Sequence, residues 1–443
     1  MSEEILNVQE ELNEQMQIRR DKLAEYEADG IYPFGQRFVV KDHAKEIKDD
    51  FFLKYDGQPV VIAGRLMTIR SHGKTAFANV RDKSGDIQVY FRKDVLGEEN
   101  YKYVKMLDIG DIVGIEGHVF KTHTGEVTIK VNKLTLLSKS LRPLPEKWHG
   151  LKDTELRYRQ RYVDLIVNPE VRDTFVKRSQ IVAKIREYMM RDGFMEVETP
   201  MMHAIPGGAA ARPFITHHNA LDIDIYMRIA PELYLKRLIV GGMDRVFEMN
   251  RCFRNEGIDN RHNPEFTTIE SYQAYGDVED AIRLTENLVS YCAQEVLGTQ
   301  EITYQGTEIN LTPPWNRITM AEGVKKYTGE DFDAVTTVEE ARAIADRLNV
   351  EYTDNDGIGK ILNACFEDYV EENLIQPTIV YGHPKEISPL AKASRENPLA
   401  TERFEAFIYG RELANGFSEL NDPIDQKQRF LDQLKEREAG DDE

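Results

Sequence analysis

The sequence is poor in cysteine, in long apolar runs and in positive charge. Its 443 residues include only three cysteines, which lie far apart and form no CxxC pair, at Cys252, Cys292 and Cys365. Neither a disulfide framework nor a zinc site is therefore expected, and the thiols are predicted to be reduced and partly buried. No apolar run reaches the roughly 18 residues that a membrane-spanning helix needs. The acidic N-terminal sequence lacks the apolar centre of a signal peptide, so we expect a cytoplasmic protein.

The net charge of −20, taken alone, disfavours nucleic acid as a partner. The charge is unevenly distributed, however. Residues 60–138 hold 12 Lys and Arg against 9 Asp and Glu, and residues 139–161 hold 7 against 3. A locally basic stretch can still follow a phosphate backbone, although a solvated surface explains the pattern equally well.

Length and residue pattern together predict several domains in an α+β protein. A helix is predicted from about Val8 to Ala28, ended by Gly30 and Pro33; it carries many charges and is either a packing arm or a nucleic-acid contact. Five short strands rich in Val, Ile and Phe then have the spacing of a small barrel of the OB type. In chain order, the expected parts are an N-terminal helical extension (1–59), an OB-fold barrel (60–138), a basic linker (139–161) and a larger domain (162–443) with a helical insertion at about 322–380.

Three residues of the predicted barrel suit contact with unpaired bases. Phe77 and Gln88 lie in successive strands, near Arg70. An aromatic ring beside an amide and a guanidinium suits stacking on bases and reading of their edges. On spacing alone, however, Phe77 is more often a core residue.

Residues 244–275 predict two strands joined by a long polar loop. Side chains alternate between the two faces of a strand. The sets expected to share a face are Glu248, Asn250, Cys252 and Arg254 in the first strand, and Phe266, Thr268, Glu270 and Tyr272 in the second. Carboxylates, an Arg and aromatic rings replace the apolar side of an ordinary hairpin, and a binding site and a solvated face explain this equally well.

Residues 400–423 repeat this pattern around a turn at Gly410. Glu405 and Glu412 lie on either side of the turn, and two carboxylates with phosphate oxygens are ligands that Mg²⁺ accepts. Asn415, Phe417 and Glu419 alternate with small residues, which indicates the wall of a binding site. Pro231 and Glu232 open a further helix, where a carboxylate often does no more than compensate the helix dipole.

Together these segments resemble the class II aminoacyl-tRNA synthetases, and most closely their lysyl subgroup. GFMEVETPMM, with the helix before it, is similar to motif 1, which forms the family's dimer interface. FRNEGIDNRHNPEFTTIESYQAY is similar to motif 2. APELYLKRLIVGG, FEAFIYGRELANGFSELNDP and RRDKLAEYEADGIYPF are similar to segments of the lysyl subgroup. The resemblance covers residues of about 10–440.

The resemblance implies an N-terminal OB-fold β-barrel that binds the anticodon, followed by an antiparallel catalytic sheet with flanking helices. It implies that L-lysine is activated by ATP, with Mg²⁺, to lysyl-adenylate and transferred to tRNA(Lys) by a homodimer joined through motif 1. No side chain acts as a covalent nucleophile, because the lysine carboxylate attacks the α-phosphate directly. Catalysis then consists of positioning and charge neutralisation.

The resemblance also implies roles for individual residues. Arg254 would be the catalytic residue that bridges the lysine carboxylate and the α-phosphate, and Phe266 would stack on adenine. Glu419, assisted by Tyr272, would receive the ε-amine. The remaining assignments are the α-amine to Gly208 and Glu232, the lysine carboxylate to Asn415, the lining of the lysine site to Glu270 and Phe417, ATP to Glu256, His262 and Asn263, Mg²⁺ to Glu405 and Glu412, and the anticodon to Arg70, Phe77 and Gln88. For Phe77, this role replaces the core interpretation.

One feature of the family is not found. Class II synthetases carry a third motif, a Gly-rich strand and helix with an Arg that grips the γ-phosphate. Nothing like G-x-G-x-D-R appears after residue 421. We therefore expect a truncated chain that binds ATP poorly and has impaired activity.

Two other functions stay open on the residues alone. An aspartyl or asparaginyl synthetase also joins an OB domain to this catalytic fold, but an acidic substrate calls for cationic groups where Glu232, Glu270 and Glu419 dominate. A non-catalytic, tRNA-binding protein is the second, and it would bind tRNA without forming an adenylate.

Overall fold

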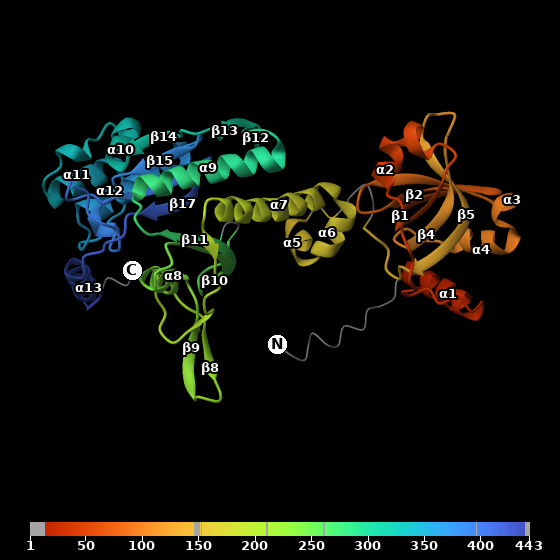
Figure 1. Ribbon diagram of the computed structural model, residues 1–443, viewed down its shortest axis with the longest axis horizontal. Helices are drawn as coiled ribbons and strands as arrows, with labels where there is room; N and C mark the ends of the chain where they lie inside the picture. Colours follow the sequence, from red (N-terminus) through yellow and green to blue (C-terminus); the bar gives the residue numbers. More distant parts are fainter. Residues whose placement is uncertain are drawn as a thin grey trace. The chain divides into compact units, whose positions relative to one another are not determined.

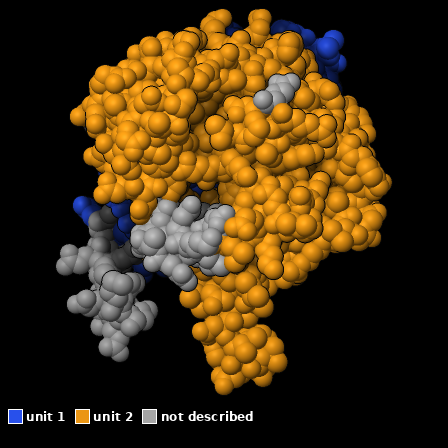
Figure 2. Space-filling model, turned by 90° about the vertical axis from the view of Figure 1, so that its left-hand side faces the viewer, with its two compact units in different colours: residues 1–173 blue, residues 174–443 orange. Residues whose placement is uncertain are grey.

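The computed structural model describes residues 14–145, 151, 153–209, 211–259, 262–395 and 397–438, the last seven of these by their backbone alone. The chain divides into two compact units, Met1–Asp173 and Thr174–Glu443 (Figure 2). The division falls within helix α7, Pro169–Arg191. The expected boundaries at residues 59, 138 and 161 all lie inside the first unit and stay proposals.

The first unit is built on a closed barrel of five strands in the order β1-β2-β3-β5-β4, as expected (Figure 1). In β2 and β3 every second residue is buried, because alternate side chains point into the barrel. The elements are α1 (Glu14–Ala28), α2 (Ala44–Asp49), a π-helical turn η1 (Phe51–Tyr55), β1 (Pro59–His72), β2 (Thr75–Arg81), β3 (Asp86–Arg92), α3 (Lys93–Leu96), α4 (Glu98–Met106), β4 (Ile112–Lys121), β5 (Val127–Ser138), α5 (Thr154–Arg159) and α6 (Arg161–Val167).

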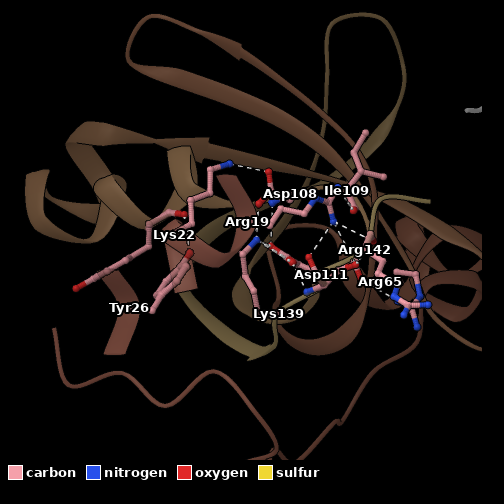
Figure 3. Close-up of polar contacts among 12 residues, drawn as sticks. Arg19, Lys22, Tyr26, Arg65, Asp108, Ile109, Asp111, Lys139 and Arg142 are labelled. Carbon is pink, nitrogen blue, oxygen red and sulfur yellow. Dashed lines mark hydrogen bonds and ion pairs between the residues drawn. The ribbon is translucent and has the colours of Figure 1, made fainter. Parts of the chain in front are cut away.

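Helix α1 is held against the barrel by a cluster of charged residues, Arg19, Lys22, Asp108, Asp111 and Lys139, which we call the clamp cluster (Figure 3). The Lys139 ammonium is fully buried and lies 2.5 Å from Asp108 and 2.9 Å from Asp111. Lys22 lies 2.6 Å from Asp108, and Arg19 donates to three backbone carbonyls of the barrel unit. These contacts favour the packing-arm interpretation of the helix, whose expected first residues, 8–13, lie outside the described residues.

The second unit contains two main sheets, in the orders β11-β10-β6 and β14-β15-β16-β17. A hairpin of β8 and β9 projects from the body of this unit (Figures 1 and 2). Besides α7, the elements are β6 (Met195–Glu196), β7 (Met202–His203), β8 (Ile215–His218), β9 (Ile223–Met227), α8 (Glu232–Val240), β10 (Arg245–Phe253), β11 (Glu265–Gln273), α9 (Val278–Leu297), β12 (Glu301–Tyr304), β13 (Thr307–Asn310), β14 (Asn316–Thr319), α10 (Met320–Thr328), η2 (Phe332–Ala334), α11 (Val338–Leu348), α12 (Ile358–Tyr369), η3 (Glu371–Asn373), β15 (Thr378–Tyr381), η4 (Lys385–Ile387), β16 (Arg403–Phe407), β17 (Glu412–Phe417) and α13 (Pro423–Glu438).

The four-stranded sheet is covered on both faces, which fixes its edge strand β17 (Figure 1). Phe404 and Ala406 pack with Ile282 of α9 on one face. Val380 and Phe407 belong to the core formed with α10, α11 and α12 on the other. Helices α10, α11 and α12 occupy the stretch expected to be mostly helical, at about 322–380, and its last residues belong to β15. Its role as an insertion stays a proposal.

Two predictions from composition can be compared with the described residues. The three cysteines are free and buried, as predicted, and burial raises the pKa of each thiol to about 11. Within the described ranges, no helix has both the length and the apolar character that crossing a membrane requires.

Candidate active site

The hairpin of β10 and β11 brings together the two sets of residues that alternation predicts. Residues directly opposite each other on antiparallel strands point to the same face. The opposed pairs along this face are Cys252 and Phe266, Asn250 and Thr268, Glu248 and Glu270, and Val246 and Tyr272. The polar face predicted from the sequence is therefore one continuous surface of the ladder.

Next to this ladder lies an acidic cluster, which we define as Glu232, Glu270 and Glu419. Glu232 is the first residue of α8, Glu270 lies on β11, and Glu419 follows β17. The Lys236 ammonium lies 2.5 Å from Glu232 and 2.9 Å from Glu419. The Tyr272 hydroxyl donates to the Glu270 carboxylate at 3.3 Å. Three carboxylates from three distant segments thus meet around one lysine and one tyrosine.

The acidic cluster carries more negative charge than Lys236 balances, although Arg228 and Arg254 also act electrostatically on Glu270. Burial, followed by repulsion from Glu232, raises the pKa of Glu270 to about 7. Burial also raises the pKa of Glu419, although Lys236 opposes the rise. The pKa of Lys236 is raised, because Glu232 and Glu419 outweigh the opposing effect of burial. Such a site favours a further cation.

Gly208 brings its backbone against the acidic cluster. Its φ of +91° lies in the left-handed region, which a side chain rarely adopts. A Cβ atom at this position would lie 3.1 Å from the Glu232 Cβ and 3.3 Å from the Ala230 Cβ. The glycine therefore allows the chain to approach Glu232 closely, in the place that the sequence assigned to the α-amine.

Arg254 lies at the other end of the hairpin face. Its guanidinium is 5.2 Å from the centroid of the Phe266 ring. The Nε atom of Arg254 is buried and has no hydrogen-bond partner among the described residues. Burial raises the pKa values of Glu270 and Glu412, and Arg254 opposes both effects. The side chain therefore acts electrostatically on the acidic cluster and on a second group of carboxylates, and it has a donor available for an anion.

That second group depends on a β-bulge. Glu405 is opposite Asn415, and the next residue of β16, Ala406, is opposite Ala414. Phe407 is then opposite Glu412, so Leu413 has no partner on β16. Because the bulge takes up this extra residue, Glu412 lies opposite Phe407 and points to the same face as Glu405 and Asn415. The two carboxylates that the sequence proposed for a metal are thereby brought close together.

The two carboxylates differ in their partners. Arg403 lies 2.5 Å and His383 3.4 Å from Glu405, and against the effect of burial they lower its pKa. Glu412 has no cation partner among the described residues, and burial and Glu405 raise its pKa. Glu371, which the sequence analysis missed, faces the same charges, and burial raises its pKa to about 7. No group of three metal-ligating side chains is found in the described part of the chain.

Asn415 and Phe417 lie on β17, in the sequence between Glu412 of one group of carboxylates and Glu419 of the other. The Asn415 side-chain oxygen accepts from Arg403 at 3.3 Å. The ring centroid of Phe417 lies 5.9 Å from the Lys236 ammonium. Both residues thus contact neighbours of the site.

Three of the residues assigned to ATP are not brought into this arrangement. Glu256, His262 and Asn263 lie on the exposed loop between β10 and β11. His262 lies 2.7 Å from Asp259, and the Asn263 amide donates to the backbone carbonyl of Glu265, the first residue of β11. Within the described residues, none of the three has a side-chain contact with the acidic cluster or with Arg254.

In the barrel unit, the three residues assigned to the anticodon lie on adjacent strands. Arg70 is directly opposite Phe77, and the neighbours of Phe77 on either side are buried, so its ring points outward. The ring stacks on Tyr90, with centroids 4.4 Å apart. Gln88 accepts a hydrogen bond from the Thr128 hydroxyl at 2.8 Å. The core interpretation of Phe77 is therefore wrong.

Sequence reasoning missed Lys236, Arg228 and Tyr90. Tyr90 follows Gln88 by two residues, so strand alternation would have found it. Lys236 follows Glu232 by one helical turn, which indicates an ion pair, but its second partner cannot be read from local spacing. Arg228 is fully buried 2.7 Å from Glu248, and its Nη2 atom has no partner among the described residues. No sequence signal indicated this pair.

Comparisons with known proteins match both units. The family described as tRNA synthetases class II (D, K and N) matches residues 153–443, and the OB-fold nucleic acid binding domain matches residues 60–137. The lysine–tRNA ligase of Thermoanaerobacter pseudethanolicus is 58% identical over 443 residues, covering 100% of this chain and 89% of that protein. The lysine–tRNA ligase of Bacillus subtilis is 56% identical over 449 residues, covering 100% of this chain and 90% of that protein.

Proposed function

Because the chain belongs to the lysine–tRNA ligases of the class II synthetase family, we propose that it joins L-lysine to tRNA(Lys) at the expense of ATP. The first step would form lysyl-adenylate and pyrophosphate, and the second would transfer the lysyl group to tRNA. The observation that carries the proposal is the acidic cluster, because its excess of carboxylates matches a substrate with two ammonium groups.

Specificity would come from the two ends of the substrate. Glu232, beside the Gly208 backbone, is proposed to receive the α-amine, and Glu419, assisted by Tyr272, the ε-amine. A desolvated carboxylate that loses its partner costs several kcal/mol, so neutral analogues of lysine would be rejected. Glu270 and Phe417 would line the same site.

Adenylate formation needs no nucleophile from the protein. One carboxylate oxygen of lysine bonds to the α-phosphorus as the bond to the pyrophosphate leaving group breaks. Arg254 is proposed to hold both reacting groups through its fork of N–H donors, and its unpartnered Nε supports this role. Asn415 would position the lysine carboxylate. The barrier would fall through positioning and charge neutralisation.

ATP would lie between the hairpin and the edge of the four-stranded sheet. Phe266 is proposed to stack on adenine, and the exposed loop with Glu256, His262 and Asn263 would close over the nucleotide. Glu405 and Glu412 would hold Mg²⁺, and the raised pKa of Glu412, due to burial and Glu405, fits a carboxylate that lacks a cation. When bound, the ion would neutralise charge on the phosphate oxygens.

The remaining partners are proposed from the barrel and from motif 1. Arg70, Phe77 and Gln88 present a side chain each to the outer face of adjacent strands, which suits the unpaired bases of an anticodon. The helix α7 and the segment after it would form a homodimer interface, as motif 1 does in the family. We further propose that the protein works in the cytoplasm, where its tRNA substrate is charged.

Replacing Glu419 by Gln tests the proposed function. We expect kcat/KM for lysine to fall by roughly 100-fold or more, because the ε-ammonium loses its charged acceptor, with the KM for ATP almost unchanged. Lysine-dependent pyrophosphate exchange and lysine binding by calorimetry would measure the effect. Glu279→Gln is the matched control, because Glu279 forms an exposed ion pair with Arg317.

Two outcomes would point to the other functions. Unchanged lysine selectivity in Glu419→Gln would favour an aspartyl or asparaginyl enzyme. Anticodon-dependent binding of tRNA by the wild-type protein, with no adenylate formed from any amino acid, would favour a non-catalytic tRNA-binding protein.

A further inference from the structure

A lysine of the chain itself lies among the carboxylates that are proposed to bind the substrate lysine. Lys236 reaches back one turn of α8 to Glu232 at 2.5 Å and across to Glu419 at 2.9 Å. Its side chain is 27% exposed, compared with 9% for Glu232. One ammonium group therefore joins two acceptors that are 187 residues apart in the sequence.

Both bridged carboxylates stand on fixed backbone. Glu232 begins helix α8, with Pro231 as the preceding cap residue. The backbone of Glu419 forms a β-bridge with Ala391, and the next amide, of Leu420, donates to the Leu390 carbonyl at 3.0 Å. With the backbone fixed, the direction of the two carboxylates is left to their side-chain contacts.

The bridge uses only one oxygen of each carboxylate. Lys236 contacts Oε1 of Glu232 and Oε2 of Glu419. The other Glu232 oxygen, Oε2, faces Gly208, 3.8 Å from the position that a Cβ atom would take there. A carboxylate can accept from several donors at once, so each acceptor keeps an oxygen for a substrate amine while Lys236 stays in place.

We propose that Lys236 is a positioning residue that sets the spacing between the acceptors of the two substrate amines, and thereby selects the length of the amino-acid side chain. This inference rests on the proposed function, in which Glu232 receives the α-amine and Glu419 the ε-amine. Without the bridging cation, the two carboxylates repel each other and turn apart, so the distance between them no longer matches lysine. The Phe417 ring, 5.9 Å from the Lys236 ammonium, adds a weaker restraint on the cation.

Lys236→Met tests this role, because methionine keeps the unbranched shape and removes the charge. We expect the Kd for lysine to rise about tenfold, and the preference for lysine over ornithine, which is one methylene shorter, to fall severalfold from the roughly 10- to 200-fold that one methylene provides. Binding of ATP and kcat should change little, because the change falls on the amino-acid side. Calorimetry with each amino acid and pyrophosphate exchange would measure these values.

Two further variants separate positioning from a general loss of charge or of folding. Lys325→Met removes the same charge from an exposed pair with Asp331 and should leave both affinities unchanged. Lys236→Arg keeps the charge on a longer, forked head. It should recover most of the lysine affinity but keep an altered lysine-to-ornithine ratio, which a merely structural role would not produce.

Some results would contradict the role of Lys236, and another would contradict the proposed function itself. Tighter lysine binding by Lys236→Met would overturn the inference and show that Lys236 competes with the substrate. An unchanged lysine-to-ornithine ratio in both Lys236 variants would also overturn it. A wild-type protein that binds neither amino acid would instead overturn the proposed function, whatever the variants do.

Discussion

The clamp cluster of the barrel unit and the acidic cluster of the catalytic unit use the same residue types to different ends. In the clamp cluster, Asp108 and Asp111 are paired with two cations, Lys22 and Lys139, and Lys139 is fully buried. In the acidic cluster, Lys236 pairs with Glu232 and Glu419, whereas Glu270 forms no ion pair within the described residues. In the clamp cluster each carboxylate is paired with a cation, whereas the acidic cluster keeps an excess of negative charge.

The difference separates a structural role from a binding role. Buried charges that are mutually paired hold elements together, and removing one leaves another exposed to the low dielectric of the interior. Carboxylates with too few partners cost the folded state energy, and the raised pKa of Glu270, due first to burial and then to Glu232, expresses that cost. Such a cost is retained where a ligand cation later removes it.

The largest effect is expected in the clamp cluster. Lys139→Met leaves Asp111 buried with no cation at contact distance, so the barrel unit should lose about 3–5 kcal/mol of stability. Hydrogen exchange of α1, β4 and β5 would measure the loss, with the second unit as internal reference. In the double variant with Asp111→Asn, the buried charge is gone and part of the stability should return. If the exchange rates of Lys139→Met equalled those of the wild type, Lys139 would not stabilise the barrel unit, and the structural role of the clamp cluster would be wrong.

A smaller effect is expected from titration of the acidic cluster. Glu270, with its pKa raised to about 7 by burial and Glu232, is largely protonated at pH 6 and must lose that proton when lysine binds. Lysine affinity should therefore increase with pH up to about 7, by about tenfold per unit below the pKa, since the ε-ammonium of lysine, with a pKa of about 10.4, stays charged throughout. Calorimetry between pH 5.5 and 7.5 would show this slope.

Glu270→Gln provides the control for that titration. The variant should bind lysine more weakly at pH 7.5 and lose most of the slope. Glu371→Gln removes a carboxyl whose pKa burial also raises to about 7, but which faces Glu405 and Glu412, so the slope should remain. A slope that survives in Glu270→Gln would assign the titration to another group.

The smallest effect is expected from Tyr272→Phe. The Tyr272 hydroxyl donates to Glu270 at 3.3 Å, and this hydrogen bond lowers the pKa of Glu270 against the larger effect of burial. Its loss should move the midpoint of the lysine-binding profile to higher pH, by up to about one unit. A midpoint that moved to lower pH would mean that the hydroxyl does not stabilise the ionised carboxylate.

The sequence predicted those parts of the fold that follow from local patterns. Strand alternation predicted the shared face of Glu248, Asn250 and Cys252, and turn residues predicted the hairpin around Gly410. The pairing of Lys236 with Glu419 could not be predicted in the same way, because it depends on how two distant segments pack. The buried pair of Arg228 and Glu248 escaped for the same reason.

Several expectations from the sequence stay predictions. The roles of the site residues, the bound Mg²⁺, the homodimer and the domain boundaries are proposals that the experiments above address in part. The expectation of weak ATP binding and impaired activity also stays a prediction, which pyrophosphate exchange by the 443-residue chain would test.

The unpaired Leu413 is an extra residue that the alternation of its neighbours does not require. Its side chain is exposed, so many residues can replace it at little cost to folding. Deleting it would make the ladder regular and leave Glu412 opposite Phe407, on the same face as Glu405. Sequences that share this hairpin should therefore vary freely in residue type at the bulge, and some should lack this residue while keeping the counterpart of Glu412 opposite that of Phe407.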